Sequence, residues 1–378
     1  MKIDINSETV KTDIYTAIAY QRGFLYKNEI PEICEDFEEV LKYFPNHKLT
    51  LSELASIYKS DNKEKSEEKL LKLISLYPEN YEYSLNLLFL YEENEWDDKK
   101  EIESIVEKLD SVNYSTPKFF EWKANRCLKK GDVINTAAFL KKYLSLYPYD
   151  KEVHIRVAKL YYLMGEFVLA QKYLSKINPI KKTSTLYRIE GICNFFMENY
   201  KEALKILESV ILIEPNDVYA LYFLGDIEER RRRSWKSDHY FSKIVSRSSY
   251  SIDEMAITAL SFLVLNETNR AEQYIQINLQ KSPDHIFSQF INGIIMLSQK
   301  KFHKCYESLL QVYKYDYFLL RREFRLIKKS LKSKLVEEFI SFLKNHDESL
   351  YLFFTLELDR DMFLEKKEKE IEKKENDS

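Results

Sequence analysis

Residues 191–217 read "GICNFFMENYKEALKILESVILIEPND" and contain the spacing that decides the fold. Gly191 is followed by Ala203 after twelve residues and by Pro215 after another twelve. The whole chain of 378 residues has only six glycines and eight prolines. Because strands and tight turns depend on these two residue types, their scarcity favours an all-helical chain. A glycine at 191 therefore needs a structural reason.

The same spacing recurs along the chain with a period of 34 residues. Gly225 lies 34 residues after Gly191, Gly293 lies 68 residues after Gly225, and Ala259 fills the position between them. A second small position has the same period and is occupied by Ala203, Ser237, Ala271 and Cys305. Prolines recur at distances close to one or two periods, at Pro45, Pro78, Pro148, Pro215 and Pro283. A fixed period of this length indicates stacked supersecondary units.

This pattern of paired helices with small residues and a late proline resembles the tetratricopeptide repeat (TPR). The resemblance implies an all-α, right-handed superhelical solenoid of about nine helix-turn-helix repeats with C-terminal capping helices. In each repeat we expect the small residue of the first helix to face that of the second, because larger side chains would separate the helices. The repeats span residues 14–46, 47–80, 81–116, 117–150, 151–183, 184–217, 218–251, 252–285 and 286–319.

The quality of the match divides the chain into four predicted parts. The repeats within 1–183 diverge from the pattern, the first three most of all, and those within 184–319 match it well. Residues 320–364 keep a helical pattern without the repeat, so we expect capping helices there. The last part, 365–378, reads "EKKEKEIEKKENDS" and is predicted to be a charged, disordered tail.

The sequence contains no catalytic or metal-binding signature that we can identify. The nucleotide-binding glycine motifs, HExxH and GxSxG are absent, the six histidines are scattered, and the four cysteines form no CxxC pair. We therefore expect no enzyme activity, no cofactor and no metal. With no secretory signal or membrane-spanning run, we expect a cytoplasmic protein, or a periplasmic one if a leader has been removed.

The TPR resemblance places the first helix of each repeat on a concave surface, which is unusually apolar in repeats six to nine. We expect it to bind a partner helix or extended segment, although packing between repeats accounts for part of it. The residues of this predicted groove are Ile189, Ile192, Phe195, Tyr219, Tyr222, Phe223, Ile257, Leu260, Phe287, Phe290 and Ile294. By contrast, repeats four and five present an ordinary polar surface.

Chaperone-tail-binding members of the family use Lys, Asn and Arg where this groove is apolar, so their function does not carry over. Bare apolar surface invites aggregation, so we expect residues 348–364 or a second copy of the chain to cover the groove. Self-association through the C-terminal helices is one form of this expectation. A partner would then have to displace the cover.

Two basic clusters offer a different function. Arg230, Arg231, Arg232 and Arg233 follow one another at the end of a helix, and residues 321–329 form a second cluster. The first could contact an acidic partner, but consecutive residues point around a helix and we expect a solvated turn. We expect replacement of these arginines by glutamine to leave stability intact.

The main hypothesis is thus a non-enzymatic adaptor that binds a protein partner and assembles a larger complex, for example of the cell envelope or a motility machine. The alternative is a nucleic-acid-binding or regulatory protein that uses Arg230–Arg233. No nucleic acid is expected under the main hypothesis, because 58 basic and 61 acidic residues give a net charge of only −3.

Overall fold

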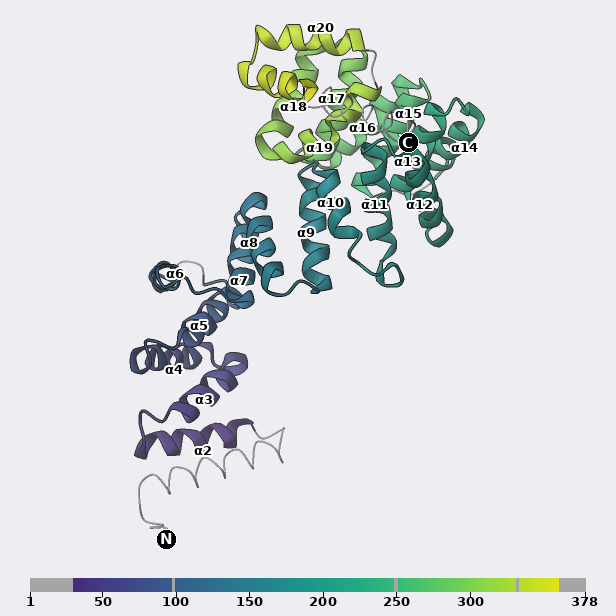
Figure 1. Cartoon of the computed structure of the whole chain (residues 1–378). Coiled ribbons are helices and arrows are strands. Elements are labelled where there is room, and N and C mark those ends of the chain that lie inside the picture. The colour runs from purple at the N-terminus through teal and green to yellow at the C-terminus, as the bar shows by residue number, and fades with distance from the viewer. Residues whose placement is uncertain (1–29, 97–98, 248–250, 331–332, 360–378) are drawn as a thin grey trace, which may run out of the picture. The chain divides into compact units, whose positions relative to one another are not determined.

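The computed structural model describes residues 30–96, 99–247, 251–330 and 333–359, which form helices joined by short turns, with no strand among them (Figure 1). The predicted all-α repeat solenoid is confirmed. The predicted disordered tail, 365–378, lies outside the described residues, as does most of the first helix expected in repeat 14–46.

The chain divides into two compact units, Met1–Pro148 and Tyr149–Ser378, called unit 1 and unit 2. This boundary follows the fourth repeat, whereas the match to the sequence pattern changes after residue 183. Unit 1 contains α2 (Ile30–Tyr43), α3 (Lys48–Asp61), α4 (Lys63–Leu76), α5 (Tyr81–Glu93), α6 (Glu101–Ser111), α7 (Pro117–Lys129) and α8 (Val133–Leu146).

Unit 2 contains five further helix pairs and a C-terminal group. The pairs are α9 (Lys151–Leu163) with α10 (Phe167–Leu174), α11 (Ser184–Phe196) with α12 (Tyr200–Ile213), α13 (Val218–Arg230) with α14 (Ser234–Val245), α15 (Ile252–Val264) with α16 (Thr268–Lys281), and α17 (Ile286–Ser298) with α18 (Phe302–Tyr315). The C-terminal group is α19 (Tyr317–Ser330), α20 (Ser333–Lys344) and the helical residues 348–359. We call the first helix of each pair A and the second B.

The turn between one B helix and the next A helix has a recurring sequence. Pro78, Pro148, Pro215 and Pro283 each lie two residues beyond the end of a B helix and two residues before the cap of the next A helix. The capping side chain accepts a hydrogen bond from the first helical turn, as Asp217 does from the amide of Ala220 at 2.8 Å. Proline stops one helix and the cap starts the next, which fixes the repeat length.

The repeated glycines make room for large side chains of the B helix. A Cβ atom added to Gly191 would lie 2.6 Å from Cγ of Leu207. The expectation that Gly191 faces the small Ala203 is therefore corrected, because the atoms nearest to it belong to Leu207 and Ile206. Ala203 itself is fully buried. The matching contacts are Gly225 with Phe241 and Gly293 with Leu309.

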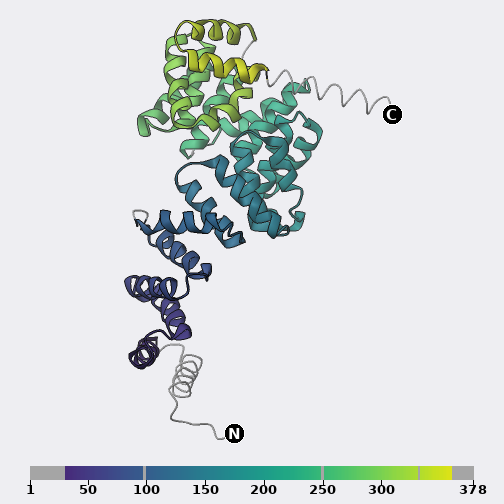
Figure 2. The same ribbon diagram turned by 60° about the vertical axis from the view of Figure 1, so that its left-hand side comes forward.

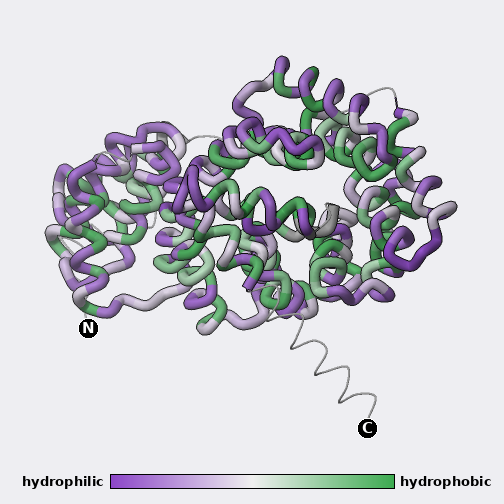
Figure 3. The backbone as a smooth tube through the Cα atoms, turned by 90° about the horizontal axis from the view of Figure 1, so that it is seen from above, coloured by the Kyte–Doolittle hydropathy of each residue, from purple (hydrophilic) through white to green (hydrophobic). Residues whose placement is uncertain are grey.

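Each unit has its own hydrophobic core between the stacked pairs. The core of unit 1 runs from Ile33 to Trp122, and that of unit 2 runs from Ile192 to Phe354. Hydrophobic and hydrophilic stretches alternate along the helices, as expected for pairs that bury one face against their neighbours (Figure 3).

The C-terminal helices extend this core. Phe354 packs against Phe324 of α19 and Phe339 of α20, with ring centroids 5.3 Å and 5.7 Å apart. Phe353 contacts Tyr313 of α18 at 5.7 Å. Residues 348–359 thus pack on α18, α19 and α20 (Figure 2).

Gly225→Leu should destabilise unit 2 by about 1–3 kcal/mol or more, because the new side chain would overlap the ring of Phe241. Glu229→Leu adds the same side chain at an exposed position of the same helix and should change stability by less than about 0.5 kcal/mol. Urea unfolding followed by circular dichroism measures both. Equal midpoints for the two variants would contradict the assigned packing.

Candidate functional site

The structure places the predicted groove residues in two settings. Nine of the eleven are buried, and Tyr219 and Phe287 are partly buried. Five of them pack inside the core of unit 2 away from the cavity, as Phe195 does against Phe223 of the next A helix at 4.8 Å, and Ile189 is buried outside this core cluster. The other five face a cavity: Tyr219, Tyr222, Phe223, Ile257 and Phe287.

Helix α19 forms the opposite wall of this cavity. It contacts α9 and α17, and its residues Leu319, Arg322, Glu323 and Leu326 line the cavity together with the A helices. Leu320, Phe324 and Ile327 are buried as well. Helix α19 therefore lies across part of the apolar surface of the A helices, in contact with α9 and α17, and a cavity remains between it and α13 and α15.

The turn between α9 and α10 shows how closely α19 approaches. Gly165 has φ +72°, and a Cβ atom there would lie 3.2 Å from the Cα atom of Arg322. A side chain here would be strained by the left-handed backbone and would also press against the backbone of α19. The next residue, Glu166, pairs with Arg321 at 2.8 Å. These contacts join the first repeat of unit 2 to its C-terminal group.

Residues 348–364 are one of the two covers predicted for the groove, the other being a second copy of the chain, and the prediction for this segment is corrected for its described residues, 348–359. The helix over the A helices is α19, and residues 348–359 pack behind it. The sequence of α19 conceals this role because its charges suggest a solvated surface. Arg321 is paired with Glu166 and Glu357, and Arg322 with Glu323 at 2.6 Å, so the charges enter the interior as pairs.

The cavity has a volume of about 500 Å³ and combines aromatic rings with carboxylates. Burial raises the pKa of Tyr162 and of Tyr219 well above the ordinary value, so both phenols stay neutral. Burial by itself would lower the pKa of Arg322. The negative charge of Glu323 is among the interactions that outweigh this effect, so the pKa is raised overall and the guanidinium stays charged. The guanidinium lies over the ring of Tyr162, 5.2 Å from the centroid.

Unit 1 has a separate groove of about 510 Å³ lined by its own A helices α3, α5 and α7, with two residues of α4. The indole of Trp122 donates to the carbonyl of Leu88 at 3.1 Å and so links α7 to α5. Lys59 and Glu93 form an ion pair of 2.7 Å between α3 and α5. Most of the lining is polar: Ser52, Glu53, Ser56, Lys59, Ser66, Asn86, Glu93, Lys118 and Glu121.

Two side chains of this groove are free to contact a ligand. Lys118 and Asn86 are exposed, and neither forms an ion pair or a side-chain hydrogen bond within the described part of the chain. The half-buried ring of Phe89 adds an apolar contact between them and α3. Sequence reasoning assigns Lys118 to an ordinary polar surface and does not single out this groove.

Comparisons with known proteins agree with this architecture. The chain is 22% identical over 233 residues to a TPR repeat-containing protein of Methanocaldococcus jannaschii, a match that covers 59% of this chain and 36% of that protein. No family model matches the chain. The helix pairs, their 34-residue period and this relative all indicate a tetratricopeptide repeat protein. The chain fits the tetratricopeptide repeat family.

Solved TPR structures also resemble the chain in their helical repeats. A TPR protein of Parabacteroides merdae is 13% identical, with a TM-score of 0.37, and the match covers 75% of this chain and 98% of that one. MamA of Desulfovibrio magneticus is 18% identical, with a TM-score of 0.36, and the match covers 45% of this chain and 96% of that one.

The arginine cluster in the seventh TPR repeat is largely paired with acids. Arg230 pairs with Asp226 at 3.0 Å, and Arg231 and Arg233 lie 3.1 Å and 3.8 Å from opposite oxygens of Glu228. The Glu228 side chain is only 2% exposed. The expectation of a merely solvated turn is corrected, because two of the arginines neutralise a buried carboxylate.

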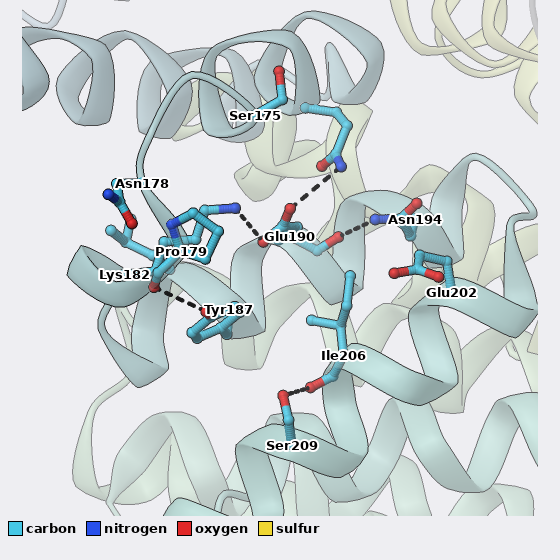
Figure 4. Close-up of polar contacts among 12 residues, drawn as sticks. Ser175, Asn178, Pro179, Lys182, Tyr187, Glu190, Asn194, Glu202, Ile206 and Ser209 are labelled. Carbon is cyan, nitrogen blue, oxygen red and sulfur yellow. Dashed lines mark hydrogen bonds and ion pairs between the residues drawn. The ribbon is translucent and has the colours of Figure 1, made fainter.

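A buried ion pair that the sequence analysis did not identify lies at the start of the sixth TPR repeat (Figure 4). Lys182 follows the 3₁₀ turn Pro179–Lys181 and meets the carboxylate of Glu190 at 2.7 Å. Gln171 and Asn194 donate to Glu190 at its carboxylate and its backbone carbonyl. The pair ties the connection between α10 and α11 to α11, a structural role.

Two further properties bear on function. Within the described residues, no group of three histidine, cysteine or acidic side chains is placed to hold a metal ion. None of the described helices combines the length and the apolar content needed to cross a membrane.

Gly165→Ala should loosen α19, because the new methyl group meets the Arg322 backbone. Gly131→Ala is the matched control, since Gly131 has nearly the same φ, +74°, with nothing within 4 Å of an added Cβ. Both changes should cost about 1 kcal/mol or more from backbone strain. Only Gly165→Ala should raise amide hydrogen exchange in α19, and unchanged exchange there would contradict the contact.

Arg231→Gln combined with Arg233→Gln should destabilise unit 2 by about 1–3 kcal/mol, because the Glu228 carboxylate would stay buried without a partner. Adding Glu228→Gln should restore most of the loss. Arg232→Gln is the control, since Arg232 is exposed and unpaired within the described residues. Thermal unfolding separates these outcomes, and equal midpoints for all variants would refute the pairing.

Proposed function

We propose that the chain is a non-enzymatic adaptor that binds a segment of a protein partner in the concave groove of unit 1 and helps to assemble a larger complex. The observation that carries the proposal is the difference between the inner surfaces of the A helices in the two units. In unit 2, α19 lies across part of the apolar surface of the A helices, whereas in unit 1 the A helices line a mostly polar groove in which Lys118 and Asn86 are exposed.

The chemistry of the unit 1 groove favours an extended, partly polar segment. Asn86 can hydrogen-bond to a peptide backbone, Lys118 can pair with a carboxylate, and Phe89 can pack against an apolar side chain. Stacked helical repeats present extended concave surfaces of this kind for binding.

A second candidate keeps the partner site predicted from the sequence, the apolar surface of unit 2. It is favoured by α19 itself, an amphipathic helix already held there. A partner helix would bind by replacing α19, and the buried Leu320, Phe324 and Ile327 make that exchange costly. Self-association through the C-terminal helices would be a special case of the same exchange.

The nucleic-acid alternative has less support. Three of the four residues Arg230–Arg233 are engaged with carboxylates, so the cluster offers little free positive charge for phosphates. Binding that weakens steeply with added salt would favour this alternative.

The proposal is tested by capturing partners with the full chain and titrating each purified partner against variants. Ser56→Arg places a bulky charge in the groove and should weaken binding by about tenfold or more. Ser104→Arg introduces the same side chain at an exposed position of α6 outside the groove and should bind as the unaltered chain does. Equal affinities for both variants would refute the unit 1 site. A partner that ignores Ser56→Arg and raises amide exchange in α19 would support the second candidate.

A further inference from the structure

We propose that the cavity between α19 and the A helices of unit 2 binds an organic cation, an ammonium or guanidinium group on a short apolar body. The cavity belongs to unit 2 alone and is separate from the proposed partner groove. Its volume of about 500 Å³ lies within the range of small-molecule sites.

Aromatic rings make up much of the cavity wall. They come from three A helices and are Tyr162, Tyr219, Tyr222, Phe223 and Phe287. The face of an aromatic ring attracts cations. Two of these rings already show that preference, since Arg322 lies over Tyr162 and Arg188 over Tyr219, each 5.2 Å from the centroid. Phe287 is half buried and has no cation over its ring within the described residues.

The charges of the wall are predominantly negative. Four carboxylates, Asp253, Asp284, Asp316 and Glu323, face the single guanidinium of Arg322. The lining residues therefore hold more carboxylates than guanidinium groups, although Arg188 also lies over the ring of Tyr219. Asp253, Asp284 and Asp316 are exposed to solvent at this concave surface, so an approaching cation is attracted and an anion is repelled.

The existing contacts leave part of this charge uncompensated. Glu323 is matched by Arg322 at 2.6 Å, and Asp253 lies 3.1 Å from His285. Asp316 caps α19 by accepting from the amide of Leu319. Asp284 forms no ion pair or hydrogen bond within the described part of the chain, so its carboxylate is available to a ligand.

The arrangement selects an organic cation over a metal ion. The acidic groups come from separate segments, Asp253 from α15, Glu323 from α19, and Asp284 and Asp316 from the turns before α17 and α19. Among the described residues, no three acidic, histidine or cysteine groups are close enough to hold a metal. Ring faces and the apolar side chains of Ile257, Ile286 and Leu319 instead suit an alkyl chain beside the charge. The same chemistry is found in a free small amine and in an arginine or lysine side chain of a peptide.

The proposal is tested by titrating the full chain with n-butylguanidinium in a calorimeter. The neutral n-butylurea has nearly the same shape, so the comparison isolates the charge. We expect saturable binding of n-butylguanidinium and about tenfold or more weaker binding of n-butylurea. Absence of saturable binding, or equal affinity for the two compounds, would overturn the proposal.

Two variants locate the site. Asp284→Asn and Phe287→Leu should each weaken n-butylguanidinium binding, by about three- to tenfold. Asp238→Asn changes the net charge of the chain equally at an exposed position of α14 outside the cavity and should have no effect. Equal weakening by Asp238→Asn and Asp284→Asn would show only a general charge effect and would refute the site. Thermal unfolding of each variant confirms that the fold is kept.

Two further probes distinguish the source of the cation. Agmatine represents a free amine, and N-acetyl-L-argininamide represents an arginine within a peptide. Tighter binding of the first supports a small-molecule ligand, and tighter binding of the second supports a peptide side chain. Failure of both to compete with n-butylguanidinium would contradict a shared cation site. Because Ser56 lies in unit 1, Ser56→Arg should leave all of these affinities unchanged, which keeps this test independent of the proposed adaptor function.

Discussion

In three of the five helix pairs of unit 2, a large B-helix side chain enters the space that a glycine leaves on the paired A helix. Leu207, Phe241 and Leu309 occupy these spaces, and each is fully buried. The close approach sets the distance between the two helices of a pair. Each pair then has an apolar face that only the next pair can cover, so stacking follows from the same constraint.

Stacking lines up the A helices, and their inner surface must either bind something or be covered. In unit 2, α19 lies across part of it, and Arg321 and Arg322 of this helix pair with Glu166, Glu357 and Glu323. The cover does not fill all of the space, and the remaining cavity has an aromatic and acidic wall. Unit 1 instead has a polar groove in which Lys118 and Asn86 are free. The two units thus offer different chemistry from the same helical repeat.

The paired arginines explain how a protein so rich in charge buries some of it. Glu228 and Glu190 are both buried on A helices, and each is matched by a basic side chain from a neighbouring turn or connection. A buried carboxylate without such a partner would be costly. These pairs contribute more to fixing the turns than to recognition of a partner, so a run of arginines is not by itself a binding site.

The sequence alone determined the helix pairs, their 34-residue period and the family resemblance. It could do so because local signals repeat: a proline that stops a B helix, a cap such as Asp217 that starts the next A helix, and Gly191 at the close contact. Only the tertiary structure decided which surface is covered. The contact between Gly165 and Arg322 joins residues far apart in the chain, and no periodic pattern reports it. The same holds for Arg321, which appears solvated in sequence and is paired in space with Glu166 and Glu357. The packing of distant segments and the pairing of their charges therefore determined which residues line each cavity and which of them remain free to bind a ligand.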